Sequence, residues 1–424
     1  MKDRFWKIMA KKDVLINDVQ TKEEKLQLAR ECVKNEKFEE AVKLYDEAVK
    51  LDSADAGLEL AQMYQTGFGI LADEKKASYY FELAAMLENA EAQNSMGDCF
   101  YFGQGVPRNY RKAVYWYKQA VKQEYAGAYE SLANCYYRGE GVVQNYPEAI
   151  KYFELASKND SAWSLYYLGE CYFYAKGVEK DEAKAAGYYV EAAKLGHVLA
   201  ASAAGDCYSY GNGVQKDFSE AVKWYTVAAD AGNEWALNKL ANCYYYGDGV
   251  EQDEAKAFEY FKKSAEAGNK NSMCRMGDCY YYERGVAKNY EEAFKWYLKA
   301  AEDGHNFSKF SVANCYFNGH GVEQNYEEAV KWYLQAAEQN IDNAVNKLGD
   351  CYANGYGVEQ NYEEAYKWYL QAAEKGNGWA QDNLGSFFEY GKGVEKDLEK
   401  AVYWYKKASE KGNRHAKTRL QRLA

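Results

Sequence analysis

The sequence predicts an all-α protein built from ten consecutive helix pairs, each 36 residues long. Cysteine recurs at this interval at Cys99, Cys135, Cys171, Cys207, Cys243, Cys279, Cys315 and Cys351. Alanine recurs in the same register at Ala77, Ala113, Ala149, Ala185, Ala221, Ala257, Ala293, Ala329, Ala365 and Ala401. Glycine does so at Gly69, Gly105, Gly141, Gly177, Gly213, Gly249, Gly285, Gly321, Gly357 and Gly393. All three residue types recur at the same 36-residue spacing, with no insertion between copies. Such a spacing indicates a solenoid in which each repeat packs on its neighbours.

Each repeat reads as two short helices joined by a glycine loop. In one copy the pattern predicts a first helix over 128–137, a Gly-x-Gly-Val loop at 139–142 and a second helix over 146–157. The apolar positions of the second helix follow i, i+3, i+4, i+7 spacing, which places them on one face: Ala149, Tyr152, Phe153 and Ala156. Two glycines allow positive φ, so the chain can turn back tightly.

Large side chains are expected to pack against the alanine column. The large column holds Trp116, Trp224, Trp296, Trp332, Trp368 and Trp404, with Tyr in the other copies. A small residue opposite a large one lets neighbouring helices approach closely.

These columns resemble the Sel-1-like repeat family, which is related to the tetratricopeptide repeat but has a longer loop. In one copy the family motif stands as Ala344, Leu348, Gly349, Tyr352, Gly355, Gly357, Val358, Ala365, Trp368, Tyr369, Ala372 and Ala373. The resemblance implies a right-handed superhelical α/α solenoid and a role as an adaptor or scaffold between proteins.

The repeat register divides the chain into four parts. Residues 1–21 form an N-terminal amphipathic segment, and 22–53 resemble a tetratricopeptide hairpin because they have no Gly-x-Gly loop. Residues 54–413 hold the ten Sel-1-like repeats, and 414–424 form a basic, polar helix that is expected to cap the last apolar face. The first segment is expected either to cap the first hairpin or to bind a partner; a membrane-surface helix is a third reading.

Charge and hydropathy exclude several classes of partner. The net charge of −11 argues against nucleic acid, because phosphate neutralisation needs a basic face. No apolar run reaches the about 18–20 residues that a membrane span requires, so we expect no integral membrane association. Residues 1–20 do not read as a secretory signal, and we therefore expect a cytoplasmic protein.

No residue pattern indicates catalysis, a metal or a cofactor. Equivalent cysteines of adjacent repeats should lie about 10 Å apart, beyond the about 7 Å Cα limit for a disulfide, so they are read as buried, reduced thiols. The four histidines lie in different copies without a second ligand at i+4: His197, His305, His320 and His415. The glycine pairs follow helices and lack the spacing of nucleotide-binding loops. We therefore expect no enzyme activity.

The candidate binding site lies at the end of each first helix. Two variable, mostly aromatic positions there should face the concave groove, by analogy with tetratricopeptide repeats. An acidic or amide column three residues earlier lies on the same helix face because of the i, i+3 spacing. The candidate groove residues are Asp98, Tyr101, Phe102, Asn134, Tyr137, Arg138, Glu170, Phe173, Tyr174, Asp206, Tyr210, Asn242, Tyr245, Tyr246, Asp278, Tyr281, Tyr282, Asn314, Phe317, Asn318 and Asp350.

Tyrosine offers rigid amphipathic contact area, amides can bond a peptide backbone, and carboxylates can pair with Lys or Arg. The sequence therefore predicts a non-catalytic adaptor that holds a partner protein or peptide in the groove, with a basic partner favoured by the acidic charge. Two readings stay open. The protein could be a structural spacer or regulatory subunit that docks partners through its termini, or the acidic column could merely cap or solvate helices. The oligomeric state is not predicted.

Overall fold

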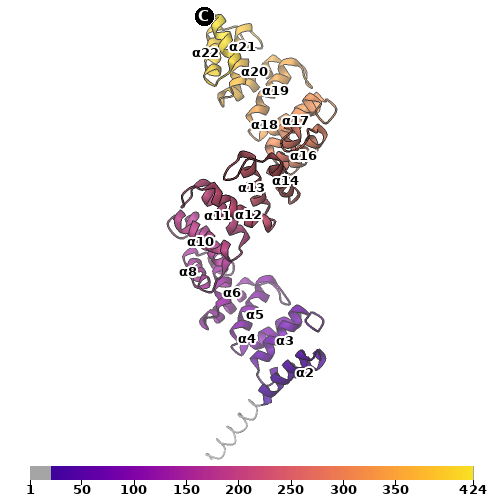
Figure 1. Cartoon of the computed structure of the whole chain (residues 1–424), viewed down its shortest axis with the longest axis vertical. Helices are drawn as coiled ribbons and strands as arrows, with labels where there is room; N and C mark the ends of the chain where they lie inside the picture. The colour runs from indigo at the N-terminus through magenta and orange to yellow at the C-terminus, as the bar shows by residue number, and fades with distance from the viewer. Residues whose placement is uncertain (1–20, 424) are drawn as a thin grey trace, which may run out of the picture. The chain divides into compact units, whose positions relative to one another are not determined.

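The structure, a computed structural model, describes residues 21–423 and contains only helices and their connections within that range (Figure 1). It divides into two compact units, residues 21–216 and 217–423. The first unit comprises helical residues 21–34, α2 (Phe38–Val49), α3 (Ala54–Thr66), α4 (Glu74–Met86), α5 (Ala90–Phe102), α6 (Tyr110–Lys122), α7 (Ala126–Arg138), α8 (Tyr146–Ser157), α9 (Ala162–Phe173), α10 (Glu182–Lys194) and α11 (Val198–Tyr210).

The second unit continues the same alternation of helices. It comprises α12 (Phe218–Asp230), α13 (Glu234–Tyr246), α14 (Glu254–Glu266), α15 (Lys270–Tyr282), α16 (Tyr290–Glu302), α17 (Asn306–Asn318), α18 (Tyr326–Glu338), α19 (Asp342–Asn354), α20 (Tyr362–Glu374), α21 (Gly378–Tyr390), α22 (Leu398–Glu410) and α23 (Arg414–Leu423). From α3 onward the odd-numbered helices are the first helices of the repeats and the even-numbered ones are the second helices.

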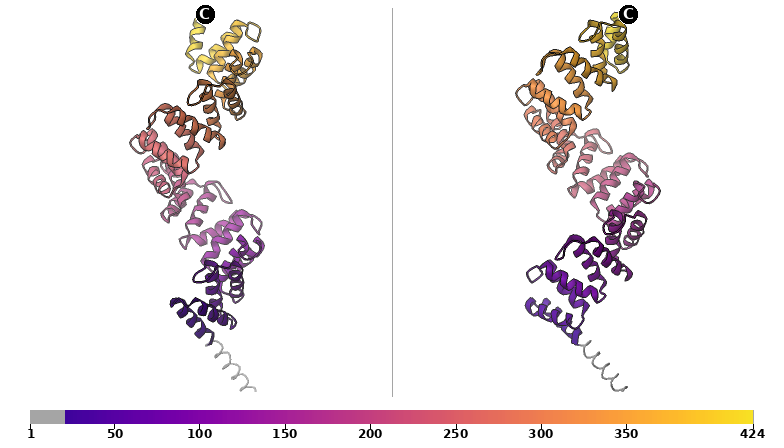
Figure 2. Two further views of the ribbon diagram at one scale, coloured as in Figure 1. Left: turned by 90° about the vertical axis from the view of Figure 1, so that its right-hand side faces the viewer. Right: turned by 180° about the vertical axis from the view of Figure 1, so that it is seen from behind.

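Neighbouring helices pair as antiparallel hairpins within each unit, as the turned views show (Figure 2). Within each unit, a first helix packs on the second helix that follows it and, less extensively, on the second helix that precedes it. Some first helices of successive repeats also touch: α5 touches α7 in the first unit, and α19 touches α21 in the second. An N-terminal helical pair, residues 21–34 and α2, precedes the ten repeats and packs on α3. The predicted amphipathic segment, residues 1–21, lies outside the described residues except for its last residue.

Polar N-caps start the helices in the repeat register. Each second helix begins after an Asp or Asn whose side chain accepts a hydrogen bond from a backbone N–H of the first turn, as Asn325 does from Glu328 at 3.0 Å. Such a cap contributes about 1 kcal/mol to helix stability. His197 and His305 cap α11 and α17 in the same way, each accepting through Nδ1. These two histidines therefore have a helix-capping role.

The two loop glycines serve different purposes, as the repeat containing α17 and α18 illustrates. Gly319 ends α17 with φ +71°, and a Cβ built there would lie 3.3 Å from its nearest neighbour. Gly321 also has positive φ, but its Cβ would lie 2.0 Å from the backbone oxygen of Tyr290, which starts the second helix of the preceding repeat. The first glycine thus supplies a backbone conformation, whereas the second also allows contact between repeats.

The large column packs against the alanine-rich core without forming its centre. The Trp column is only partly buried: Trp332, Trp368 and Trp404 lie at the edge of the apolar clusters. The residue after each Trp or Tyr is the one that is completely enclosed, as Tyr117, Phe153, Tyr333 and Tyr405 are. One residue along a helix turns the side chain by about 100°, so the neighbour of the Trp faces the first helix instead.

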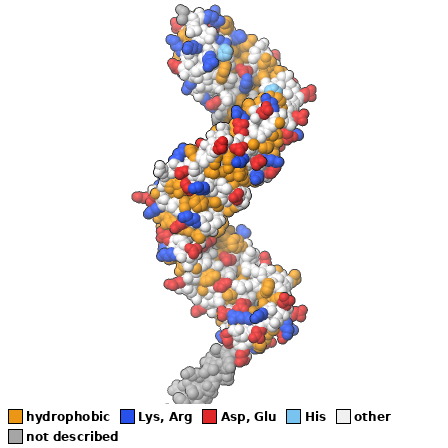
Figure 3. Space-filling model, viewed as in Figure 1, with side chains coloured by type: hydrophobic (Ala, Val, Ile, Leu, Met, Phe, Trp, Pro, Cys, Tyr) orange, Lys and Arg blue, Asp and Glu red, His pale blue; other side chains and the backbone are white. Residues whose placement is uncertain are grey.

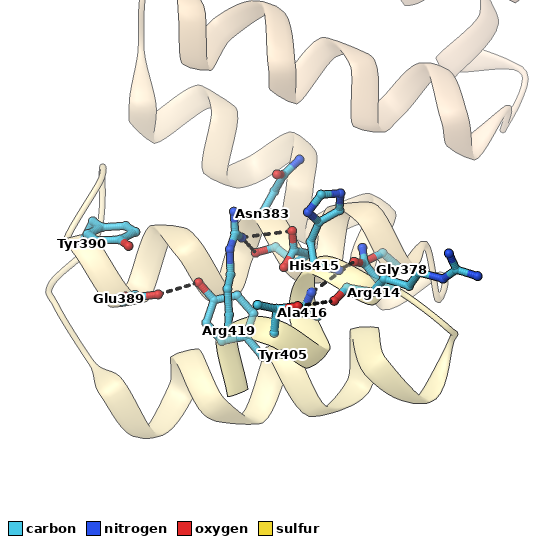
Figure 4. A network of polar contacts seen from close by, with 12 residues as sticks. Gly378, Asn383, Glu389, Tyr390, Tyr405, Arg414, His415, Ala416 and Arg419 are labelled. Atoms are coloured by element: carbon cyan, nitrogen blue, oxygen red, sulfur yellow. Dashed lines mark hydrogen bonds and ion pairs between the residues drawn. The ribbon is translucent and has the colours of Figure 1, made fainter. Parts of the chain in front are cut away.

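The last helix, α23, closes the second unit (Figure 4). Its Ala416 is buried with Phe388, Tyr405 and Ala408, and Leu420 packs against this cluster. Arg419 Nη1 lies 3.0 Å from Asp382 Oδ2, and the Asp382 side chain is only 5% exposed. A polar helix with one apolar stripe thus covers the apolar face of the last repeat.

Candidate functional site

The acidic or amide column lies half-buried on the first helices, and most of its members bond a buried tyrosine of the same repeat. Tyr117 donates to Asp98 at 2.7 Å, and Tyr297 donates to Asp278 at 2.8 Å. The same bond joins Tyr189 to Glu170, Tyr333 to Asn314 and Tyr369 to Asp350, at 2.9, 2.7 and 2.8 Å. Burial raises the pKa of Asp98 to about 6, although the bond from Tyr117 lowers it. These side chains therefore support the fold directly.

Packing also decides which residue occupies the column. Where a carboxylate stands, glycine precedes it: a Cβ on Gly97 or Gly277 would lie 2.4 Å from the ring of the facing tyrosine. In two repeats the facing residue is a phenylalanine, and alanine then precedes an asparagine in the column. Ala133 and Asn134 face Phe153, and Ala241 and Asn242 face Phe261. A phenylalanine supplies no hydroxyl donor, and a neutral amide costs less to bury than a carboxylate without that donor. The repeat of Ala313, Asn314 and Tyr333 is a mixed case.

Asn134 provides a test of this rule. Its Oδ1 is buried and has no hydrogen-bond partner among the described residues, because Phe153 has no hydroxyl. The change Phe153→Tyr should supply that donor and raise the free energy of unfolding by about 1 kcal/mol. The repeat with Ala313, Asn314 and Tyr333 shows that alanine, asparagine and tyrosine fit together at these positions. The reverse change there, Tyr333→Phe, should lower the free energy of unfolding by about as much as Phe153→Tyr raises it. Urea denaturation of both variants measures this; shifts of equal sign would refute the pairing rule.

The first of the two variable aromatic positions packs against the next repeat. Tyr101 bonds Glu140, and Tyr281 lies 2.8 Å from His320 Nδ1. Tyr137 accepts from Lys176 Nζ at 2.6 Å. Each of these partners is the middle residue of the following Gly-x-Gly loop or its equivalent. The aromatic side chains at this position are half-buried, so their principal contacts are internal. They are Tyr101, Tyr137, Phe173, Tyr245, Tyr281 and Phe317.

The second variable position is exposed in every repeat. It holds Phe102, Arg138, Tyr174, Tyr210, Tyr246, Tyr282 and Asn318. Tyr246 and Tyr282 remain 55% and 61% exposed although each is the last residue of a first helix. The predicted groove set therefore separates into structural residues and residues that a partner can reach.

Sequence reasoning missed a further exposed column at the start of the first helices. Four side chains there are about half-exposed: Trp163, Trp235, Phe307 and Trp379. The first three lie seven residues before a member of the acidic or amide column, and Trp379 lies seven residues before Ser386, which is in the same register. The i, i+7 spacing puts them on the same helix face. Their regular interval of two repeats was a signal in the sequence. Together with the acidic or amide column and the second variable position, they form what we call the first-helix face.

Pockets open on the first-helix face of the second unit. One of about 440 Å³ is lined by residues of three successive first helices, including Asn242, Asp278 and Phe307. A second of about 380 Å³ includes Asp350 and Trp379. A third of about 260 Å³ includes Tyr245, Asp278 and Tyr282. The structure thus brings together several of the predicted residues, and the missed aromatic column borders two of the three pockets. In both units, apolar side chains reach the surface among charged ones (Figure 3).

The repeated cysteines are buried and unpaired. Burial raises the pKa of Cys135 and Cys315 to about 12, so their thiolates are scarce at neutral pH. Among the described residues, no cluster of His, Cys, Asp and Glu could hold a metal ion.

Thiol reactivity should follow this burial. Of the ten cysteines, Cys32 alone is partly exposed, so a thiol reagent at pH 8 should modify about one group in the native protein. Denaturation should expose all ten. Rapid modification of several groups before unfolding would show that the column is accessible.

Within the described part of the chain, every helix is too short or too polar to cross a membrane.

These features define an α-helical repeat protein whose first helices present an exposed polar and aromatic face. The Sel1 repeat model matches ten stretches: 54–89, 90–125, 126–161, 164–197, 198–233, 236–269, 270–305, 308–341, 343–377 and 380–413. The chain belongs to the Sel1 repeat family. Proteins of this family typically mediate protein interactions, and their solenoids are usually non-catalytic.

Solved structures agree with this assignment. A protective antigen of uropathogenic Escherichia coli strains, which displays an SLR fold, is 34% identical, with a TM-score of 0.85 over 90% of this chain and 82% of that one. A Sel1 repeat protein from Oxalobacter formigenes is 27% identical, with a TM-score of 0.58 over 73% of this chain and 89% of that one. Comparison with curated proteins finds no match.

Proposed function

We propose that this protein is a non-catalytic adaptor that binds a partner protein or peptide on its first-helix face. The observation that carries the proposal is the exposed aromatic set on that face, which includes Tyr246, Tyr282 and Trp379. Exposed rings that recur on one face are typical of protein interaction surfaces, because Tyr and Trp combine apolar area with a polar group.

The charge of the chain supports a partner that is basic around the contact. A net charge of −11 attracts such a partner at long range and speeds association. The carboxylates of the acidic column contribute less than their number suggests, because those of Asp98, Glu170, Asp278 and Asp350 already accept hydrogen bonds. Specificity within the contact therefore rests on rings and amides.

Localisation in the cytoplasm is part of the proposal. Ten cysteines without a disulfide support it, since oxidising compartments favour paired cysteines.

The test requires a purified partner. The full chain, immobilised, captures candidates that mass spectrometry identifies, and the dissociation constant of each purified candidate is then measured by biolayer interferometry. The double change Tyr246→Ala and Tyr282→Ala removes two exposed rings of the first-helix face. It should weaken binding at least about tenfold, since interface tyrosines are frequent hot spots.

A matched control removes rings elsewhere. Tyr115 on α6 and Tyr403 on α22 are similarly exposed but belong to second helices. The control Tyr115→Ala and Tyr403→Ala should leave the dissociation constant unchanged, with helicity by circular dichroism retained in both variants. Equal binding by both double variants would contradict the proposal and favour docking through the ends of the chain.

A further inference from the structure

Two pockets of the first-helix face lie at equivalent positions, two repeats apart. The pocket of about 440 Å³ that includes Asn271, Arg275, Asp278 and Phe307 is here called pocket A. The pocket of about 380 Å³ that includes Asn343, Lys347, Asp350 and Trp379 is called pocket B. Each residue of the second set follows its counterpart in the first by 72 residues, or two repeats. Both pockets lie within the second unit.

The equivalence extends to individual atoms. In pocket A, Asp278 accepts from Tyr297 through Oδ1 at 2.8 Å and lies 3.4 Å from Arg275 Nη1 through Oδ2. In pocket B, Asp350 accepts from Tyr369 through Oδ1 at 2.8 Å and lies 3.1 Å from Lys347 Nζ through Oδ2. Each pocket therefore contains one cation and one carboxylate that neutralise each other. A charged ligand group would lose hydration there without gaining an unpaired counter-charge.

What remains available in each pocket is a ring and an amide. Phe307 and Trp379 are 45% and 59% exposed. In pocket A, the side chain of Asn271 makes no hydrogen bond to the described residues. In pocket B, Asn343 Oδ1 accepts from Asn377 Nδ2 at 3.3 Å, and Asn343 Nδ2 donates to none of the described residues. An exposed ring offers contact to an apolar side chain. The amide of Asn271 can bond both the N–H and the C=O of an extended backbone, and the Nδ2 donor of Asn343 can bond a backbone C=O.

The repeat between the pockets lacks this combination. In that repeat, the position of the asparagine holds Phe307 and the position of the cation holds Ser311. The position of the ring holds Asn343. The combination of asparagine, cation and ring thus occurs at pockets A and B and not in the repeat between them.

Resting on the proposed function, we propose that pockets A and B together bind one extended, uncharged segment of the partner, which places two bulky apolar side chains about six residues apart. Residues of three successive first helices line pocket A, and α19 touches α21, so first helices of successive repeats lie close together here. Packed helices lie about 10 Å apart, and equivalent points two repeats apart are therefore separated by about 20 Å. An extended chain advances about 3.3 Å per residue, which gives about six residues between the two anchors.

The experiment uses a displayed library of random twelve-residue peptides selected on the full-length protein. Enriched peptides should carry pairs of Leu, Met, Phe or Trp at a separation of about six. Fluorescence anisotropy with a selected peptide should show at least about tenfold tighter binding than with the same peptide cut to one anchor, because the second anchor binds intramolecularly. Either change, Phe307→Ala or Trp379→Ala, should reduce the affinity of the two-anchor peptide to the one-anchor value.

Tyr403→Ala, which removes an exposed ring from α22, is the control and should bind as the unchanged protein does. Circular dichroism confirms that each variant is folded. A library without a preferred separation, or a preference that survives both pocket changes, would overturn the proposal. If the purified partner still loses affinity for the Tyr246→Ala, Tyr282→Ala variant in that case, the adaptor function stands and only the two-pocket inference fails.

Discussion

Replacing Gly321 by alanine is expected to lower the free energy of unfolding by about 3–5 kcal/mol, whereas Gly319→Ala should cost about 1–2 kcal/mol. Both glycines have positive φ, and an L-residue in that backbone conformation accounts for the cost of about 1–2 kcal/mol. Only at Gly321 would the new Cβ also meet backbone, 2.0 Å from the oxygen of Tyr290. The native protein already carries Ala175 and Glu283 at the position of the first glycine, with φ 56° and 60°.

Because repeat proteins can unfold in parts, the measurement combines urea denaturation with hydrogen exchange. Gly321→Ala should accelerate exchange in α16, α17 and α18, which meet at this loop. Gly319→Ala should affect mainly the end of α17. Equal losses of stability in the two variants would show that contact between repeats adds nothing to the backbone requirement.

Removing the cation that faces Asp382 is expected to destabilise the C-terminal end of the second unit. The change Arg419→Met leaves a carboxylate that is only 5% exposed without its ion pair, and it should cost about 1–3 kcal/mol at neutral pH. This loss of stability is smaller than the loss expected for a fully buried ion pair, because the Arg419 side chain is 33% exposed and its charge is partly screened by solvent. Arg414→Met is the matched control, since Arg414 points away from this contact (Figure 4).

The stability lost in the Arg419→Met variant should depend on pH. Burial raises the pKa of Asp382 above its ordinary value, while Arg419 and His415 lower it. A carboxyl whose pKa is raised in the folded state contributes most at low pH, and this contribution is lost as pH rises through the folded pKa. Loss of Arg419 raises that pKa further. The variant should therefore differ little from Arg414→Met near pH 4 and increasingly toward pH 7.

Thermal unfolding between pH 4 and 8 measures this difference. Adding Asp382→Asn to Arg419→Met should restore most of the stability at neutral pH, because the unpaired charge is then absent. A deficit that is the same at every pH would mean that Arg419 acts through its apolar stem and its contact with the Tyr405 ring.

The sequence predicted more of the fold than of the site, and individual residues show why. The periods of Cys135 and Gly141 reveal the repeat without any structure, because every copy must meet the same neighbours. The roles of Asp278 and Tyr281 depend on residues distant in sequence. Asp278 accepts from Tyr297 in the next helix, and Tyr281 meets His320 in the next repeat. Helical periodicity places both on one face but does not identify these partners.

The missed column illustrates the opposite difficulty. Trp163 and Trp379 look like core residues by type, and only the structure shows them half-exposed at the start of a first helix. Their interval of two repeats is visible in the sequence, but exposure depends on which helices pack nearby. A tryptophan in a repeat array is therefore uninformative until its neighbours are known.

The sequence by itself determined the helix pairs and the repeat boundaries from about residue 54, because these depend on local propensity and on a period within one chain. Tertiary structure decided which side chains a partner can reach. It committed Asp98 and Tyr101 to internal hydrogen bonds, left Tyr282 exposed, and brought residues of three first helices into one pocket. The physical reason is that burial and hydrogen bonding are properties of neighbours in space, and neighbouring first helices are a whole repeat apart in the chain.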